Sequence, residues 1–435
     1  MRTKLAPVGY PKTLRNLSCH QLAQQILECC LDGRDWPLQA LDQIIQCALS
    51  ADPARAEEGN CALFKTLAEG LADRFEPRLA DIYGEIFAQV IAAAEPGLSP
   101  RELVERYRQV RRTIPFNQRR RPVQRVFVLS RVTLGADIAV TSVLLDAAKR
   151  RFADAEIILA GSQASRQLFG RDPRIGFCEI TYERGGSLRE RLAVGRKLAE
   201  LLADPESIVI DPDSRLTQLG LFPVATPDRY YFFDSRSYGG ESGDPLPVLA
   251  ARWAAEVFGV IGAAPFVAPA PETAYAQLDG AIVVNLGVGE NAAKRVPDPF
   301  ERELVAFLAK LGLPVLLDVG AAPEEQARVR RAAEAATNSS GNVRLWRGSF
   351  AALVANIARC RLYVGYDSAG QHAAAACGAP MVTVFAGFVS ERMLARWSPW
   401  GPGPKEIIRV DKPDPEPVLA RTRAAVEKLI QDPVG

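Results

Sequence analysis

The most constraining feature of this chain is the segment from Arg361 to Phe385, which reads RLYVGYDSAGQHAAAACGAPMVTVF. Its two ends are short runs of β-branched and aromatic residues, which are typical of buried strands. The run of small residues between them predicts a short helix that packs closely against its neighbours, and Gly378 and Pro380 predict where that helix ends. A strand, a helix and a second strand in this order indicate an α/β fold with a parallel sheet.

The turn that opens this helix is suited to binding phosphate. Asp367 and Ser368 are typical N-cap residues, so we expect the helix to begin at Ala369 or Gly370. Backbone N–H groups at such a helix start point outward, and the helix dipole adds about half a positive charge. His372, one of two histidines in the chain, lies on the same turn. An ordinary strand–loop–helix connection, with His372 as a packed surface residue, remains the alternative.

Size and charge narrow the class of protein. The 435 residues are enough for two or three domains, and 48% hydrophobic with 24% charged residues is typical of a globular chain. A net charge of +2 argues against nucleic acid as a partner. We find no secretory leader and no run of about 20 apolar residues that could cross a membrane, so we expect a cytoplasmic protein.

The cysteines do not indicate a metal site. There are eight of them, with five before residue 62, and none has CxxC or Cys/His ligand spacing. We therefore expect reduced, packed thiols and no zinc.

The pattern of apolar and charged residues changes along the chain. Residues 1–112 carry apolar residues at helical spacing and predict a domain of four or five helices without a chemical signature. Residues 113–124 form a basic linker that includes Arg119 to Arg121. We favour a solvated linker, but a contact with an acidic membrane surface or a phosphate-rich partner stays open.

Strands and helices then alternate, which predicts two doubly wound parallel sheets, in residues 125–268 and 269–435. Ligands of such sheets bind at the carboxyl ends of the strands, so the crevice between the two halves is the expected site.

Several polar residues follow predicted strands. In the first half, Asp137 stands after Gly135 and is expected either to cap the next helix or to act as a general base facing the cleft. In the second half, Lys294 and Arg295 lie on a loop where a cation could neutralise a diphosphate. The alternative for this loop is solvent-facing basic residues.

Two acidic pairs are weaker candidates. Glu324 and Glu325 follow a strand and could accept hydrogen bonds from ribose hydroxyls, although an acidic first turn of a helix is the commoner role. Asp211 and Asp213 form a DxD pair, for which a structural or acceptor-side role is favoured over a metal site.

Four segments, in this order, resemble a known family. They are RVTLGADIAVTSVLLDAAKRRFADAEIILAG, SIVIDPDSRLTQLG, NLGVGENAAKRVPDPF and YDSAGQHAAAACGAPMVTVFAGFVSERMLARWSPWGPG. Together they are similar to glycosyltransferase family 9, the ADP-heptose:lipopolysaccharide heptosyltransferases, from about Arg125 to Gly403. The helical residues before 112 lie outside the resemblance. Two turns differ: the family's LGD reads LGAD here, one residue longer, and DSGPMH reads DSAGQH.

The resemblance implies a GT-B fold, in which an acceptor-side and a donor-side Rossmann-like domain face a cleft. It implies transfer of heptose or a similar sugar, with inversion, from a nucleoside diphosphate, ADP in the family's name, to a lipid-linked or lipopolysaccharide-type glycan. It implies no metal or other cofactor, and it is compatible with peripheral contact at the inner membrane. A nucleotide-sugar epimerase on the same scaffold, or a decayed module that binds nucleotide or recruits a partner, remain alternatives.

The resemblance also assigns roles to residues. Asp137 falls on the catalytic aspartate, Lys294 on the lysine that contacts donor phosphate, and Asp367 on the aspartate that contacts the donor sugar. The amides of Ser368, Ala369 and Gly370, with His372 beside them, match the diphosphate-binding turn. Glu324, or Glu325, is similar to a glutamate that binds ribose.

Overall fold

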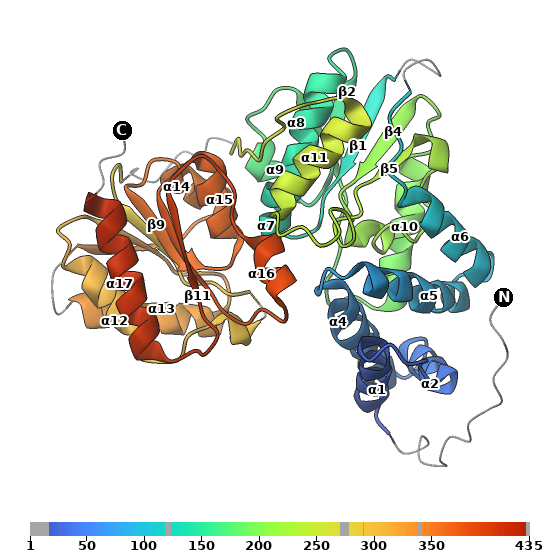
Figure 1. Ribbon diagram of the computed structural model, residues 1–435, viewed down its shortest axis with the longest axis horizontal. Coiled ribbons are helices and arrows are strands. Elements are labelled where there is room, and N and C mark those ends of the chain that lie inside the picture. Colours follow the sequence, from blue (N-terminus) through green and yellow to red (C-terminus); the bar gives the residue numbers. More distant parts are fainter. Residues whose placement is uncertain (1–16, 118–122, 270–277, 290, 338–341, 432–435) are drawn as a thin grey trace.

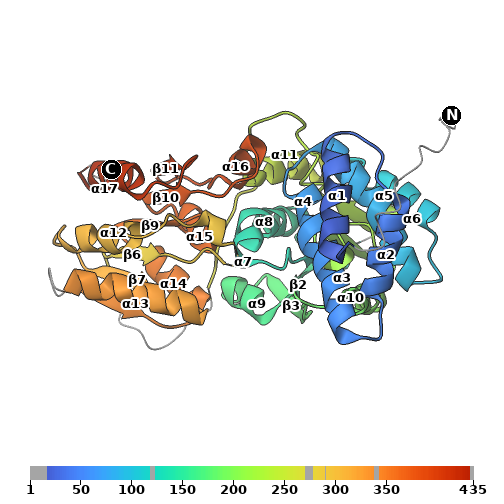
Figure 2. The ribbon, with the colours of Figure 1, turned by 90° about the horizontal axis from the view of Figure 1, so that it is seen from below.

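The computed structural model describes residues 17–117, 123–269, 278–289, 291–337 and 342–431. These residues form two sheet domains that lie side by side, and a helical region that packs on the first of them (Figure 1). The view from below shows helices on both faces of each sheet, with α7 and α15 between the two domains (Figure 2).

The N-terminal sheet domain contains five parallel strands in the order β3-β2-β1-β4-β5. Val126 of the central strand pairs with Ile157 on one side and Ile208 on the other. The strands are β1 (Arg125–Leu129), β2 (Glu156–Gly161), β3 (Ile175–Glu179), β4 (Ser207–Asp211) and β5 (Tyr230–Phe232). The helices are α8 (Ser142–Arg151), α9 (Gln163–Phe169), α10 (Leu188–Leu201) and α11 (Leu246–Phe258). The alternating sequence pattern therefore predicted this sheet correctly.

The C-terminal sheet domain contains six parallel strands in the order β11-β10-β9-β6-β7-β8. The strands are β6 (Ile282–Asn285), β7 (Val315–Asp318), β8 (Val343–Trp346), β9 (Leu362–Tyr366), β10 (Met381–Phe385) and β11 (Lys405–Arg409). The helices are α12 (Phe300–Ala309), α13 (Pro323–Thr337), α14 (Phe350–Ile357), α15 (Ala369–Cys377), α16 (Glu391–Trp397) and α17 (Pro415–Gln431). This sheet is the second of the two predicted doubly wound halves.

Two strands, β3 and β11, have only a weak strand pattern in the sequence. Both lie at an edge of their sheet and are only partly buried. An edge strand has one neighbour instead of two and packs less side-chain surface, so its sequence carries fewer apolar residues and a weaker strand signal.

The helical region agrees with the predicted four or five helices. It contains α1 (Cys19–Leu31), α2 (Leu38–Ala48), α3 (Pro53–Cys61), the π-helical turn η2 (Ala62–Ala68), α4 (Glu69–Ala72), α5 (Pro77–Ala94) and α6 (Pro100–Val110). Because α3, η2 and α4 run on as one continuous stretch, residues 17–117 contain five helical stretches. Pro53 is the first residue of α3, and the side chain of Asp52 caps that helix. Proline is tolerated there because the first helical N–H has no partner within the helix.

The helical region and the N-terminal sheet share one hydrophobic core. Leu63 and Phe87 of the helical region belong to the same buried cluster as Leu129 and Val209 of the sheet. Leucines of α10 belong to this cluster as well. Asn60, at the contact, accepts a hydrogen bond from the N–H of Leu188 at 2.6 Å. The boundary expected near residue 112 therefore divides the sequence but not the core.

The predicted linker is partly packed. The N–H of Phe116 donates to the carbonyl of Val257 at 2.7 Å, and its ring contacts Phe152 edge-on at 5.1 Å. Arg119 to Arg121 lie outside the described residues. Within the ranges that the structure covers, no helix combines the length and apolar character that a membrane span needs.

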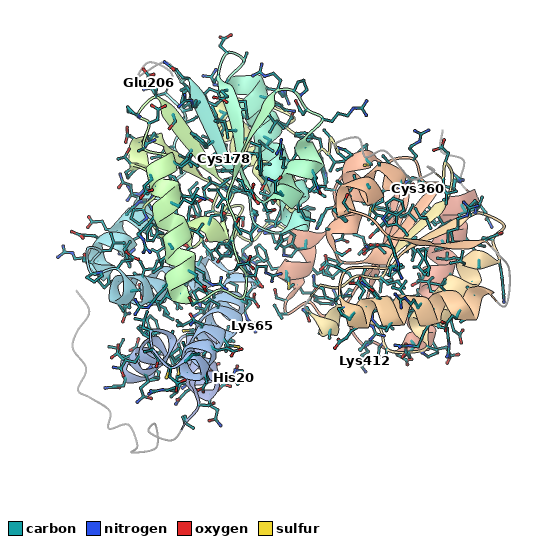
Figure 3. All side chains as sticks on the ribbon, turned by 180° about the vertical axis from the view of Figure 1, so that it is seen from behind. His20, Lys65, Cys178, Glu206, Cys360 and Lys412 are labelled. Carbon is teal, nitrogen blue, oxygen red and sulfur yellow. The ribbon has the colours of Figure 1, made fainter. Side chains whose placement is uncertain are left out.

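All eight cysteines are free thiols. Cys178 lies in the N-terminal sheet domain and Cys360 in the C-terminal one (Figure 3). Among the described residues, no group of three or more His, Cys, Asp and Glu side chains is placed to hold a metal ion.

Asn60→Ala should lower the free energy of unfolding by about 2 kcal/mol, because it leaves the buried N–H of Leu188 and the carbonyls of Ala48 and Ala56 without a side-chain partner. Urea denaturation measures this, with Gln39→Ala on the exposed face of α2 as the control. A change no larger than that of the control would contradict the shared interface.

Candidate functional site

The candidate site lies at the carboxyl end of the C-terminal sheet. β6 and β9 are hydrogen-bonded neighbours, so the loops that follow them meet at one edge. Lys294, the last residue of the short helix η6 (Ala292–Lys294), reaches from the first loop to the second. Its Nζ donates to Oδ2 of Asp367 at 2.5 Å. The structure thus brings together two residues that are 73 positions apart in the sequence.

The loop after β10 supports the turn that carries Lys294. Gly387 has a left-handed backbone (φ 68°), and a Cβ at this position would lie 2.6 Å from the carbonyl carbon of Ala293. Glycine is required on both counts, since a side chain would strain the backbone and displace the turn.

Gln371 holds the other side of the Asp367 carboxylate. Its Nε2 donates to Oδ1 of Asp367 at 2.5 Å and to the carbonyl of Trp397 at 3.2 Å. Its Oε1 accepts from the hydroxyl of Thr383 at 2.8 Å. The amide is fully buried, so this network fixes the orientation of Asp367. The sequence analysis did not select Gln371, although a polar residue among the alanines of this helix was an available signal.

The turn predicted to bind phosphate has the expected start. Helix α15 begins at Ala369, as predicted, and ends at Gly378 in a left-handed conformation. Ser368 occupies the N-cap position, but its side chain makes no capping bond, and its hydroxyl donates to Oδ1 of Asn285 at 3.3 Å. The N–H groups of the first turn, including those of Ala369 and Gly370, therefore have neither an intrahelical partner nor a side-chain cap.

His372 is packed inside the site and does not line it. Its side chain is buried, and its ring lies 5.9 Å from that of Trp397. Burial lowers the pKa of His372 to about 4, with the nearby Asp367 opposing that change and Lys294 adding to it. The ring is therefore packed, as in the alternative interpretation, but in the interior and not at the surface, and its expected contact with diphosphate stays a prediction.

Asp137 lies at the junction of α7 (Leu134–Ala136) and the π-helical turn η3 (Asp137–Thr141). The N–H of Ser142 donates to the carbonyl of Asp137, five residues back, instead of four. A π-turn accommodates one extra residue in a helix. The longer LGAD turn is thus absorbed without a break in the helix.

The carboxylate of Asp137 points into the N-terminal sheet domain. It accepts hydrogen bonds of 2.7–2.8 Å from the hydroxyls of Ser130, Ser165 and Thr141 and from the N–H of Arg131, and it is fully buried. In this conformation the carboxylate is therefore enclosed by four donors of its own sheet domain, and its expected role as a general base facing the cleft stays a prediction. Burial nevertheless raises the pKa of Asp137, and the four hydrogen bonds oppose this rise.

Two of the four segments that resemble family 9, the one around Asp137 and the one around Asp367, meet across the interface between the sheet domains. α7 packs against the start of α15, and a Cβ at Gly135 would lie 3.2 Å from the Cα of Ala369. Asp137 is thus two residues from Gly135, where the N-terminal sheet domain contacts the start of α15, the turn predicted to bind phosphate.

Of the two glutamates, Glu325 is the one at the sheet edge. Glu324 is exposed, whereas the carboxylate of Glu325 lies over the backbone of Gly287 and Gly320. Burial, and then the charge of Asp318, raise the pKa of Glu325. One residue along a helix turns a side chain by about 100°, so only one of two neighbours can face the strand ends, and the assignment of Glu324 is corrected to Glu325.

The DxD pair is divided between two networks. Asp211 accepts from Thr217 at 2.6 Å and from Tyr230 at 2.5 Å, whereas Asp213 forms an ion pair with Arg236. Both carboxylates are satisfied by protein groups, which agrees with the favoured structural role.

Residues 268–417 match the model of glycosyltransferase family 9 (heptosyltransferase). The match spans the Lys294 loop, β9, α15 and α16. It confirms the predicted resemblance and the predicted enzyme class, a glycosyltransferase. Among curated proteins, none matches the chain in sequence.

Solved structures of this family share the fold. A family 9 glycosyl transferase from Veillonella parvula is 15% identical, with a TM-score of 0.55 over 73% of this chain and 99% of its own. Heptosyltransferase WaaC of E. coli, solved with ADP, is 17% identical, with a TM-score of 0.51 over 71% and 99%. ADP-heptose lipopolysaccharide heptosyltransferase II of E. coli is 18% identical, with a TM-score of 0.51 over 71% and 98%. The GT-B architecture is thereby confirmed.

His372→Gln should make stability less sensitive to acid. Between pH 6.5 and 4 the unfolded chain binds a proton at His372 that the folded chain does not, so the wild type loses stability as the pH falls through that window. We expect the wild type to lose about 2 kcal/mol more than the variant between pH 7 and pH 4.5.

Urea denaturation at the two pH values measures this difference. His20→Gln, at the exposed histidine of α1 (Figure 3), is the matched control. Equal acid sensitivity in wild type and His372→Gln would show that His372 is not held neutral.

Proposed function

We propose that this chain, which carries the family 9 match over residues 268–417, transfers a sugar from a nucleoside diphosphate donor to a glycan acceptor with inversion at the anomeric carbon. The observation that carries the proposal is the meeting of Lys294 with the uncapped start of α15 at the carboxyl edge of the C-terminal sheet. An ammonium group and outward N–H groups at one point suit a pyrophosphate.

The donor's pyrophosphate takes over the ammonium of Lys294 from Asp367. In the structure Lys294 is only 20% exposed and is neutralised by that carboxylate. When the bond from the sugar to the pyrophosphate breaks, negative charge grows on the leaving oxygen. Lys294 and the dipole of α15 stabilise that charge. Asp367, still held by Gln371, is then free to orient sugar hydroxyls.

Adenosine is the proposed nucleoside. WaaC has been solved with ADP and with ADP-2-deoxy-2-fluoro heptose. In this chain, Glu325 and Asp318 present carboxylates next to Asn285 at the ends of β6 and β7. Carboxylates at strand ends accept hydrogen bonds from ribose hydroxyls, so this edge is the proposed nucleoside position.

The proton of the acceptor hydroxyl goes to Asp137 in this proposal. Its raised pKa makes the carboxylate a stronger base than an exposed aspartate, as general base catalysis requires. The turn formed by Arg131 to Ala136 must open to expose it, which breaks the hydrogen bond from the N–H of Arg131. A glycan of the lipopolysaccharide or lipid-linked type is the proposed acceptor, on the strength of the family alone.

Lys294→Ala should weaken ADP binding at least tenfold, because a charge-assisted contact with phosphate is lost. Isothermal titration calorimetry with ADP and UDP measures the affinities. Lys310→Ala, at an exposed lysine after α12, is the control and should bind like the wild type. Equal ADP affinity in the wild type and Lys294→Ala would remove Lys294 from the phosphate site.

Asp137→Asn should lower kcat at least 100-fold and change ADP affinity less than threefold, because an amide cannot take the proton. The serine and threonine hydroxyls around it can rotate to accept from the new amide, so the fold is expected to survive. Steady-state kinetics with an ADP-sugar and an acceptor glycan give the two numbers. A loss smaller than tenfold would leave Asp137 only the role of holding the turn.

A further inference from the structure

The helical region, which lies outside the family match, reaches α16 beside the candidate site through Phe75. Phe75 follows α4, is 1% exposed and has a left-handed backbone (φ 58°). Such a conformation is strained for a residue with a large side chain, and it persists only where the surroundings hold it. Here the surroundings include Trp397 and Arg392 of the C-terminal sheet domain.

The contact partner of Phe75 is Trp397, the last residue of α16. The two rings meet edge to face, with centroids 6.0 Å apart and planes at 79°. Arg392, in the same helix, donates to the carbonyl of Phe75 at 3.2 Å. Phe75 belongs to the hydrophobic core that joins the two sheet domains, whereas Leu71 and Leu79 on either side of it belong to the core of the helical region.

Trp397 is also in contact with the candidate site. Its carbonyl accepts the hydrogen bond from Gln371, the residue that fixes Asp367. Its ring packs on His372, and the guanidinium of Arg131 from the N-terminal sheet domain lies 5.7 Å from the ring centroid. The helical region and both sheet domains therefore meet on one indole.

The rest of α16 is tied to the N-terminal sheet domain. Arg396 is 1% exposed and donates to the carbonyls of Ser242 and Asp244 at 2.6 and 2.7 Å. Arg392 donates to the carbonyl of Gly240 at 2.8 Å. These bonds come from a helix that projects from the C-terminal domain toward the other two parts of the chain (Figures 1 and 2).

The helical region is itself rigidly mounted on the N-terminal sheet domain. The hydroxyl of Tyr83 donates to the carbonyl of Gln218 at 3.2 Å, and Arg106 donates to the carbonyl of Gly220 at 2.8 Å. A movement of α16 away from the N-terminal sheet domain would therefore separate Phe75 from Trp397.

We propose that the helical region braces the donor site, with Phe75 as a positioning residue that acts through Trp397 on Gln371 and Asp367. With the ring of Phe75 in place, Trp397 is held against His372, and Gln371 keeps the Asp367 carboxylate beside Lys294. Without it, α16 loses its apolar contact with the helical region, and the start of α15 becomes more mobile. The link to donor affinity rests on the proposed function, whereas the link to mobility does not.

The test compares Phe75→Ala and Phe75→Leu with Phe87→Ala, all in the full chain. Phe87 is as deeply buried in the helical region, stacks on Tyr83 and belongs to the helical core, so it controls for general loss of packing. Leucine restores most of the volume at position 75. The first readout is amide hydrogen exchange of residues 367–373 and 391–397, and the second is ADP affinity by calorimetry.

We expect Phe75→Ala to speed exchange in both segments at least threefold and to weaken ADP binding about tenfold. Phe75→Leu should recover most of both effects, and Phe87→Ala should change neither, whatever its effect on melting temperature. Wild-type exchange in Phe75→Ala, or the same acceleration in Phe87→Ala, would overturn the proposal. If the wild type binds no nucleotide but the exchange difference is found, the brace stands and the proposed function fails.

Discussion

Hydrogen bonding between β6 and β9 is the constraint on which the candidate site depends. These strands are far apart in the sequence but adjacent in the sheet, and both run in the same direction. Their following loops must therefore meet, and this meeting allows Lys294 and Asp367 to form an ion pair. A lysine on one loop and a helix start on the other create a positive position that neither loop has alone.

Charge at this position is balanced by a buried network. Asp367 neutralises Lys294, and Gln371 occupies the remaining carboxylate oxygen. Because Gln371 also bonds to Thr383 in β10 and to the carbonyl of Trp397, the geometry of the ion pair depends on a neighbouring strand and on α16. Polar groups this deeply buried must be satisfied, so the network has little freedom to rearrange while the domains stay closed.

The aspartates at the strand ends of the N-terminal sheet domain differ from Asp367 in their partners. Asp137, Asp211 and Asp213 all follow strands of the sheet, and each is satisfied by hydroxyl, amide or guanidinium donors of the same domain. Carboxylates at the ends of parallel strands can serve a ligand or hold a loop, and spacing in the sequence does not distinguish these uses. In this conformation all three hold loops, although α7 and η3, the two segments that meet at Asp137, pack against α15 of the other domain.

The sequence by itself determined the architecture and the pairing of segments. Runs of β-branched and aromatic residues predicted the central strands, and apolar residues at helical spacing predicted the helical nature of the first 112 residues. The cap residues predicted the start of α15 at Ala369 or Gly370. The resemblance to glycosyltransferase family 9 assigned both the Lys294 loop and the Asp367 turn to donor binding. Tertiary structure alone decided where the side chains point. Four donors of the N-terminal sheet domain enclose the carboxylate of Asp137, the helical phase places Glu325 and not Glu324 at the sheet edge, and burial makes His372 a neutral packing residue. It also decided that Phe75 reaches Trp397, since such a contact between distant segments depends on how whole domains pack and leaves no periodic trace in the sequence.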